Sequence, residues 1–226
     1  MYLTWTAVEH AKPVPACAWR PEGAVYSQAG QAGAGAVELT GFTGTWWSVL
    51  SSWDSAEDAV AAAPVTDVAI NAAWHVVLEP VTYRGDAVLG GGALPLHALS
   101  TRGKVAGAAA VITLAGLGDD PERSGEFIER VATLGQDVRS APGHLASVLQ
   151  LPDDGPVLTM SAWRTLRDAV TWSYHRPEHA ATVRRHEEHG LVATTGFVRC
   201  AVVHSSGTLN GTDPLAGLTG RPVLAD

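Results

Sequence analysis

Four histidines lie close together late in the sequence: His175, His179, His186 and His189. At about 100° per residue, their spacings place all four within roughly an 80° arc of one helix face. Pro177 lies between the first two and can interrupt that face, because the residue before a proline avoids helical geometry. A neutral imidazole on such a face can bind a metal, move a proton or simply face solvent. These histidines are therefore the first candidates for chemistry.

The same histidines do not match a metalloprotease helix. His186 and His189 are three residues apart, whereas the zinc-binding helix pairs histidines four apart. His175 and His179 have that separation, but a proline lies between them. The Gly-Leu-Gly turn at 116–118 is followed by acidic residues that would repel a pyrophosphate, and no serine or cysteine nucleophile motif is present.

Further residues could line a cavity. His75 lies on a strand-like run and His144 precedes another strand, so either could point into the cavity as a second ligand or proton donor. His175 is a further catalytic candidate. Trp163, Trp172 and Tyr174 could form an aromatic wall for a planar cofactor or an apolar substrate. The alternative for each aromatic residue is ordinary core packing, and for each histidine a hydrogen-bonded structural position.

Composition restricts the classes of protein. The chain has 226 residues, a net charge of −8, 46% hydrophobic and 17% charged residues, which excludes a disordered chain. An acidic surface disfavours nucleic acid as a partner. Two cysteines, Cys17 and Cys200, form no paired motif, so a disulfide framework is not expected. With no signal peptide and no run of about 18 apolar residues, we expect a cytoplasmic protein without membrane insertion.

The elements that must position these residues form two similar series. In the first half, the pattern predicts strands at 3–8, 45–54 and 74–78 and a helix at 56–63, with Ser55 as its N-cap. The interval 29–35, rich in glycine and alanine, is expected to be flexible. In the second half, it predicts strands at 105–114, 145–151, 157–165 and 196–203, and helices at 121–134, from 166, and at 178–189.

This order is β-α-β-β-α-β, the ferredoxin-like arrangement. The sequence therefore predicts an α+β protein of two ferredoxin-like units, a shortened one at 1–92 and a second at 93–226 with a flexible tail from about 205. A Gly/Pro-rich joint at 90–95 separates them. Two four-stranded sheets in one chain can pack face to face and close an intramolecular barrel around a shared cavity.

Several short segments of this doubled pattern match a known family at scattered positions: Val49–Ser55, Ala63–Val65, Trp74–Pro80 with Arg84-Gly85, Ser161–Trp163, Trp172–Tyr174, Pro177–His179, Ser206–Thr208 and Asp213–Leu215. Together they resemble the spheroidene monooxygenase family, haem-associated carotenoid-oxidising proteins on the dimeric α/β-barrel theme. The resemblance covers roughly residues 46–215. One segment departs from it, because Leu191–Phe197 lacks the aromatic and acidic residues that the family carries there.

The resemblance implies a haem-dependent monooxygenase acting on an apolar small molecule. It implies b-type haem with His179 as the iron ligand, and Arg184 suits a propionate because guanidinium pairs well with carboxylates. Two alternatives remain open: a cofactor-independent α/β-barrel enzyme that uses a cavity histidine as base, and a haem- or ligand-binding protein without turnover. A homodimer also remains open.

Overall fold

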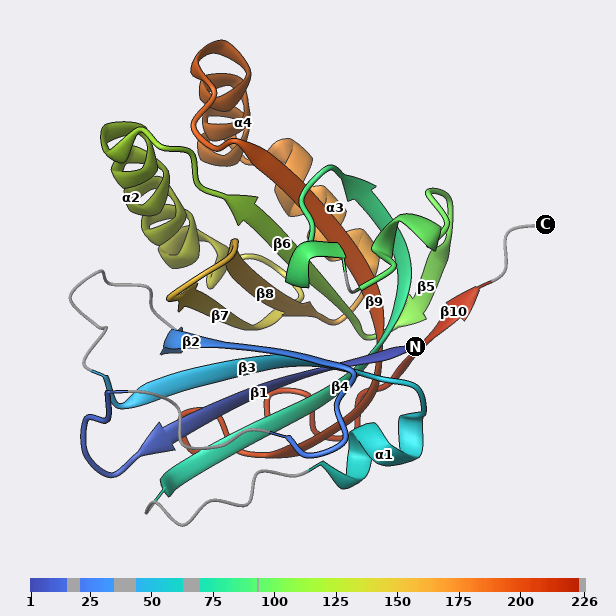
Figure 1. The fold of residues 1–226 in the computed structure, drawn as a ribbon. Coiled ribbons are helices and arrows are strands. Elements are labelled where there is room, and N and C mark those ends of the chain that lie inside the picture. The colour runs from blue at the N-terminus through green and yellow to red at the C-terminus, as the bar shows by residue number, and fades with distance from the viewer. Residues whose placement is uncertain (16–20, 35–43, 63–69, 93, 224–226) are drawn as a thin grey trace.

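The computed structural model describes residues 1–15, 21–34, 44–62, 70–92 and 94–223. Figure 1 shows a strand-rich body with three helices on one side of it and a short helix on the other. The elements are, in order, β1 (Tyr2–His10), β2 (Tyr26–Ala34), β3 (Trp46–Trp53), α1 (Ala56–Ala61), β4 (Ile70–Gly85), β5 (Lys104–Gly107), β6 (Ala109–Gly116), α2 (Pro121–Val138), β7 (His144–Pro152), β8 (Val157–Trp163), α3 (Leu166–His175), α4 (Pro177–His189), β9 (Thr194–Gly207) and β10 (Gly220–Val223), with short 3-10 turns at Gly90–Gly92 and Leu96–Ala98.

Eight strands close into one barrel in the order β1-β3-β2-β7-β8-β6-β9-β4. The first half contributes β4-β1-β3-β2 and the second half β9-β6-β8-β7, so each half has the strand order of a ferredoxin-like unit. The halves join where β2 pairs with β7 and β4 pairs with β9. The expected α+β arrangement of two units closed within one chain is confirmed.

The β2–β7 seam depends on a glycine. β2 pairs with β3 over residues 26–31 and with β7 over 30–34, and both ladders include Gly30. A Cβ atom on Gly30 would lie 2.5 Å from the carbonyl oxygen of Leu151. The expectation of a flexible interval at 29–35 was therefore wrong for residues 29–34, because the small residues allow a close strand crossing; residue 35 lies outside the described residues.

The barrel interior is filled by side chains and is not the expected open cavity. Inward-facing residues alternate along each strand, as in other eight-stranded barrels, and Trp5, Trp74 and Leu50 are among the largest fully buried. Leu96, from the segment after β4, and Leu215, from the segment after β9, belong to the same cluster. Because β4 and β9 are antiparallel, these two segments close opposite ends of the barrel.

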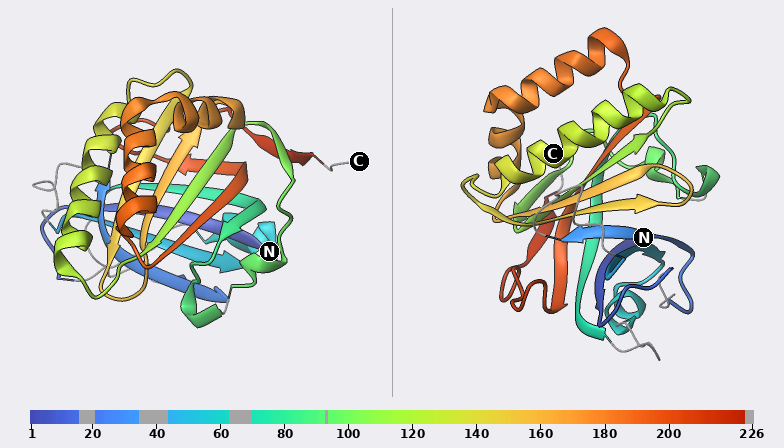
Figure 2. Two further views of the ribbon diagram at one scale, coloured as in Figure 1. Left: turned by 90° about the horizontal axis from the view of Figure 1, so that it is seen from above. Right: turned by 90° about the vertical axis from the view of Figure 1, so that its left-hand side faces the viewer.

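The three longer helices cover the second half (Figure 2), while the short α1 packs on β1, β3 and β4 of the first half. α2 packs on the sheet through Phe127, Ile128 and Val131, and α3 through Leu166 and Ala169. α4 has no buried residue and contacts α2 and α3, so it forms an outer layer. Among the described residues, none of the helices combines the length and the apolar character needed to cross a bilayer.

Two sequence-based boundaries change. The strand expected at 105–114 is divided into β5 and β6, because Gly107 has a φ of 81° and turns the chain. The segment expected as a flexible tail from about 205 is structured to residue 223: β9 runs to Gly207, a closing loop spans residues 208–219, and β10 pairs with β5. The joint at 90–95 contains the first 3-10 turn, while residue 93 is not described.

Candidate functional site at the barrel rim

Four aromatic side chains form a ladder from the barrel rim to α4. His144 begins β7, Trp163 ends β8, and Trp172 and His179 lie on α3 and α4. Consecutive ring centroids in that order are 5.2, 6.0 and 5.0 Å apart. The structure therefore brings together four residues that the sequence singled out, Trp163, Trp172, His179 and His144.

Hydrogen bonds fix the two tryptophans of this aromatic ladder. Trp163 Nε1 donates to Ser161 Oγ at 2.9 Å, and Trp172 Nε1 donates to Asp137 Oδ2 at 3.1 Å. Asp137 also accepts two hydrogen bonds from the guanidinium of Arg176, the residue between α3 and α4. These hydrogen bonds lower the pKa of Asp137, which stays ionised and ties α2 to the α3–α4 junction.

His179 packs against Trp172 in a T-shaped contact, and its Nδ1 is buried without a hydrogen-bond partner. Burial lowers the pKa of His179, so the imidazole is neutral at pH 7. The residue has the protonation state of a metal ligand. Within the described ranges, however, no three His, Cys, Asp or Glu side chains form a group that could hold a metal ion.

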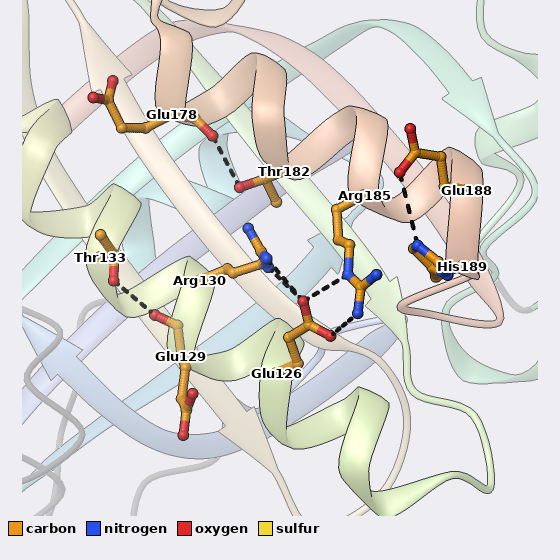
Figure 3. A network of polar contacts seen from close by, with 9 residues as sticks. All are labelled: Glu126, Glu129, Arg130, Thr133, Glu178, Thr182, Arg185, Glu188 and His189. Carbon is orange, nitrogen blue, oxygen red and sulfur yellow. Dashed lines mark hydrogen bonds and ion pairs between the residues drawn. The ribbon is translucent and has the colours of Figure 1, made fainter.

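A groove of about 370 Å³ lies between α2 and α4, and His179 is not among its lining residues. Figure 3 shows its central network: Glu126 of α2 accepts hydrogen bonds from Arg130 and from Arg185 of α4, at 2.9 Å to each Nε. These two guanidinium groups lower the pKa of Glu126 to about 2. Glu129 and Glu178 also line the groove, so its wall is acidic.

A second cavity of about 290 Å³ opens at the barrel rim, between the start of β7 and the closing loop. We call it the rim pocket. Its polar lining residues are Arg139, His144, Ser147, Asn210 and Thr212. The remaining lining residues are apolar: Leu145, Ala146, Leu209 and Pro214.

His144 links the rim pocket to the aromatic ladder. Burial is the largest cause that lowers the pKa of His144, and the nearby positive charge of Arg139 lowers it further. The imidazole is therefore neutral at pH 7 and able to accept a proton. Its Nε2 is buried and has no hydrogen-bond partner. Position, protonation state and a free nitrogen together make His144 a candidate base.

The other sequence-based candidates lie elsewhere. His75 faces away from the barrel interior, under α1: its Nε2 donates to the Ala59 carbonyl oxygen and its Nδ1 accepts from Thr6 Oγ1, both at 2.8 Å. Both nitrogens are thus engaged within the protein, and His75 does not line a described cavity. The expectation that it points into the cavity was wrong, because the strand alternation places Trp74, not His75, inside.

His175, Tyr174 and Arg184 are exposed, and Tyr174 is 68% exposed. None of the three lines the rim pocket or the α2–α4 groove. Pro177 separates His175 from His179 by ending α3 at His175, so the four histidines do not share one helix. The interruption follows from the steric restriction that proline places on the residue before it.

Sequence reasoning did not identify Arg139, Asn210 or Thr212 as part of a site. Arg139 is the C-cap of α2, and the other two lie in the closing loop, more than 60 residues later in the chain. No local spacing relates them, because only the closure of the barrel brings the closing loop to β7. His10 was also missed: it is 1% exposed at the end of β1, and neither ring nitrogen has a partner.

Comparisons with known proteins agree with this architecture. Residues 115–185 match the ABM family, described as antibiotic biosynthesis monooxygenase. No curated protein matches the chain at a significant level. An aldoxime dehydratase structure is similar over 98% of this chain and 84% of its own, at 11% identity and a TM-score of 0.53.

Two other solved structures are similar at lower scores. An aldoxime dehydratase in complex with butyraldoxime is 12% identical, with a TM-score of 0.49 over 98% of this chain and 82% of its own. The heme-degrading enzyme LmHde from Listeria monocytogenes is 9% identical, with a TM-score of 0.33 over 76% of this chain and 99% of its own. At such identities the similarities concern the fold alone.

The barrel topology and these comparisons define the class: a dimeric α/β-barrel fold, here with both ferredoxin-like halves in one chain. The segment that matches the ABM family contains α2, β7, β8 and α3, and thus Arg139, His144, Trp163 and Trp172. The match is to the monooxygenase-like ABM domain, a broader group than the spheroidene monooxygenases that scattered positions resemble.

Proposed function

We propose that the protein is a monooxygenase-type oxidoreductase that takes a small, largely apolar molecule into the rim pocket and uses His144 as the base. The observation that carries the proposal is that His144 lines a pocket of about 290 Å³, while its imidazole is neutral and has a buried Nε2 without a hydrogen-bond partner. Small-molecule sites usually combine apolar residues with a few polar groups. The rim pocket has four apolar lining residues beside five polar ones.

The reaction that a lone base supports needs an activated substrate and O2. His144 takes a proton from a CH2 group that neighbouring carbonyl or aromatic groups make acidic. The resulting carbanion transfers its electrons to O2, a C–O bond forms, and the peroxide loses water to leave a carbonyl group. The balance is R–CH2–R′ + O2 → R–CO–R′ + H2O, so O2 is the oxidant and no other reductant is consumed.

Two features support this assignment of roles. The aromatic ladder holds the His144 ring against Trp163, which limits its motion in the pocket wall. The match to the ABM family covers residues 115–185, and this segment supplies Arg139 and His144 to the pocket.

The second candidate is the haem-dependent monooxygenase implied by the resemblance to spheroidene monooxygenases. The buried, unpartnered Nδ1 of His179 favours it. The surroundings do not fit haem: Trp172 packs against the ring of His179, and the α2–α4 groove carries Glu126, Glu129 and Glu178, which would repel the propionates. Arg184 is exposed and does not line that groove. These residues therefore do not form a binding site for haem.

Oxygen uptake by the purified protein tests the proposal, with cyclic 1,3-diketones and hydroxyaryl ketones as activated substrates. We expect uptake with at least one of them without added cofactor, and a loss of about 10²-fold or more in kcat for His144→Gln. His97→Gln, an exposed histidine near the other end of the barrel, is the matched control and should retain activity.

A haem titration distinguishes the cofactor-free function from the haem-dependent one. Haem is titrated into the wild-type protein and into His179→Ala, and the Soret band is recorded with oxygen uptake. Turnover that needs haem, is lost in His179→Ala and is unchanged in His144→Gln would overturn the proposal. Absence of a Soret shift together with cofactor-free, His144-dependent uptake would support it.

A further inference from the structure

The rim pocket has a single charged lining residue, Arg139, and no carboxylate among its lining residues. The chain as a whole has 23 acidic and 15 basic residues. Asp213 lies in the closing loop but does not line the pocket, and its Oδ1 accepts hydrogen bonds from three donors. Arg139 therefore supplies the only formal charge among the lining residues of the rim pocket.

Arg139 has no ion-pair or hydrogen-bond partner for its guanidinium among the residues that the structure describes. Four other arginines of α2, α4 and the α3–α4 junction are paired: Arg123 with Asp120, Arg130 and Arg185 with Glu126, and Arg176 with Asp137. Arg139 lines the rim pocket, and its five donors remain available to a ligand.

The rest of the lining fits a carboxylate on an apolar body. Asn210, Thr212 and Ser147 are neutral hydrogen-bonding groups, while Leu145 and Leu209 belong to the apolar part of the wall. A guanidinium binds both oxygens of a carboxylate in a planar fork. The volume of about 290 Å³ admits a compact molecule of one ring.

We infer that the rim pocket binds a small aromatic or cyclic monocarboxylate, with its carboxylate on Arg139 and its ring against the apolar wall. This inference rests on the proposed function and names its substrate class. The carboxylate fixes one end of the molecule, and the activated carbon then lies toward His144, which lines the same pocket. Arg139 is thereby a specificity-determining residue for an acidic substrate.

Arg139 also has a structural role that the test must separate. It is the C-cap of α2, and a cation at a helix C-terminus stabilises the helix dipole by about 0.3–1 kcal/mol. The same dipole places partial negative charge beside the pocket, so without the guanidinium an anion would be repelled. Loss of Arg139 should therefore remove anion binding much more than it lowers stability.

The experiment compares benzoate with benzamide, its neutral analogue, by calorimetric titration. We expect the wild-type protein to prefer benzoate by about tenfold or more, and Arg139→Gln to lose this preference. Arg139→Lys keeps the charge and should retain part of the preference. Arg102→Gln, an exposed arginine without an ion pair among the described residues, is the matched control and should bind as wild type. Thermal unfolding of each variant checks that it is folded.

Equal binding of benzoate and benzamide by the wild-type protein, or an unchanged preference in Arg139→Gln, would overturn the inference. Oxygen-uptake measurements keep the two proposals apart. If substrates are oxidised in a His144-dependent way but neutral and acidic analogues react equally, the inference fails and the proposed function stands. If benzoate binds through Arg139 but no compound is oxidised, the ligand class stands and the proposed function fails.

Discussion

Trp74 and Asp213 are 139 positions apart in the chain, yet the Nε1 of Trp74 donates to Oδ1 of Asp213 at 3.1 Å. The same oxygen accepts from Ser205 Oγ at 2.7 Å and from the backbone N–H of Leu215 at 3.0 Å. Trp74 belongs to the first half of the barrel, and Asp213 belongs to the closing loop. This one carboxylate oxygen therefore holds the loop that forms one wall of the rim pocket.

Asp213→Ala should destabilise the protein and weaken the rim pocket together. The Ser205 hydroxyl and the Leu215 N–H would lose their only acceptor in the described structure, which costs about 1–3 kcal/mol. The fully buried Trp74 would keep only its hydrogen bond to Ser205 Oγ. Urea unfolding gives the free-energy change, and benzoate titration reports on the pocket. Asp213→Asn keeps an oxygen at Oδ1 and should retain most of both. Equal stability of Asp213→Ala and wild type would contradict this role.

Gly30→Ala should destabilise the β2–β7 seam by about 1–3 kcal/mol, since the added Cβ would lie 2.5 Å from the Leu151 carbonyl oxygen. Gly125→Ala is the opposite case. Gly125 lies within α2, nothing lies within 4 Å of its Cβ position, and alanine favours a helix by about 1 kcal/mol. Thermal unfolding should therefore show opposite shifts for the two substitutions. A stabilised Gly30→Ala would show that the strands are not in close contact there.

The Glu126 carboxylate should make the docking of α4 on α2 sensitive to acid. Its pKa is lowered from 4.5 to about 2 by Arg185 and Arg130, so its contribution is complete above pH 4.5 and is lost as the pH falls toward 2. Hydrogen exchange of α4 amides, corrected for intrinsic rates, should rise across that interval. Glu126→Gln should abolish the pH dependence, whereas Glu129→Gln, an exposed carboxylate of the same helix, should leave it unchanged.

The pH profile of oxygen uptake should follow the free base form of His144. Burial lowers the pKa of His144 from 6.5, so the residue stays neutral further into the acid range than an exposed histidine. We expect kcat/KM to fall toward acid with a midpoint below pH 6.5. A midpoint at or above pH 6.5 would show that another group is the base. His144→Gln should lack this acid limb in any residual activity.

Much of the fold follows from local patterns. Alternation of apolar and polar residues indicates β3, β7 and β8, and helical spacing of Phe127, Ile128 and Val131 indicates α2. The duplicated order of elements predicts two ferredoxin-like halves. The β2 strand was not identified, because its glycines and alanines carry no alternating pattern. The role of these small residues is seen only in the structure, where β2 pairs with both β3 and β7 at Gly30.

For the candidate site, too, the residue types could be predicted from the sequence, but the contacts between them could not. Aromatic residues and histidines at 163–179 could be identified from their types, and the structure places Trp163, Trp172 and His179 in contact. Their surroundings could not be predicted, since the packing of α4 on α2 depends on the charge pair between Glu126 and Arg185. Whether a histidine faces a cavity or a hydrogen-bond partner likewise depends on residues far away in the chain.

By itself, the sequence determined the elements, their duplication and the chemical types available, because periodicity and capping act over a few residues. The tertiary structure decided which of these residues meet. Closure of the barrel fills its interior, turns His75 toward Thr6 and Ala59, and brings the closing loop against the start of β7. Arg139 and His144 share a pocket with Asn210 only because long-range strand pairing and the Trp74–Asp213 hydrogen bond place that loop at the barrel rim.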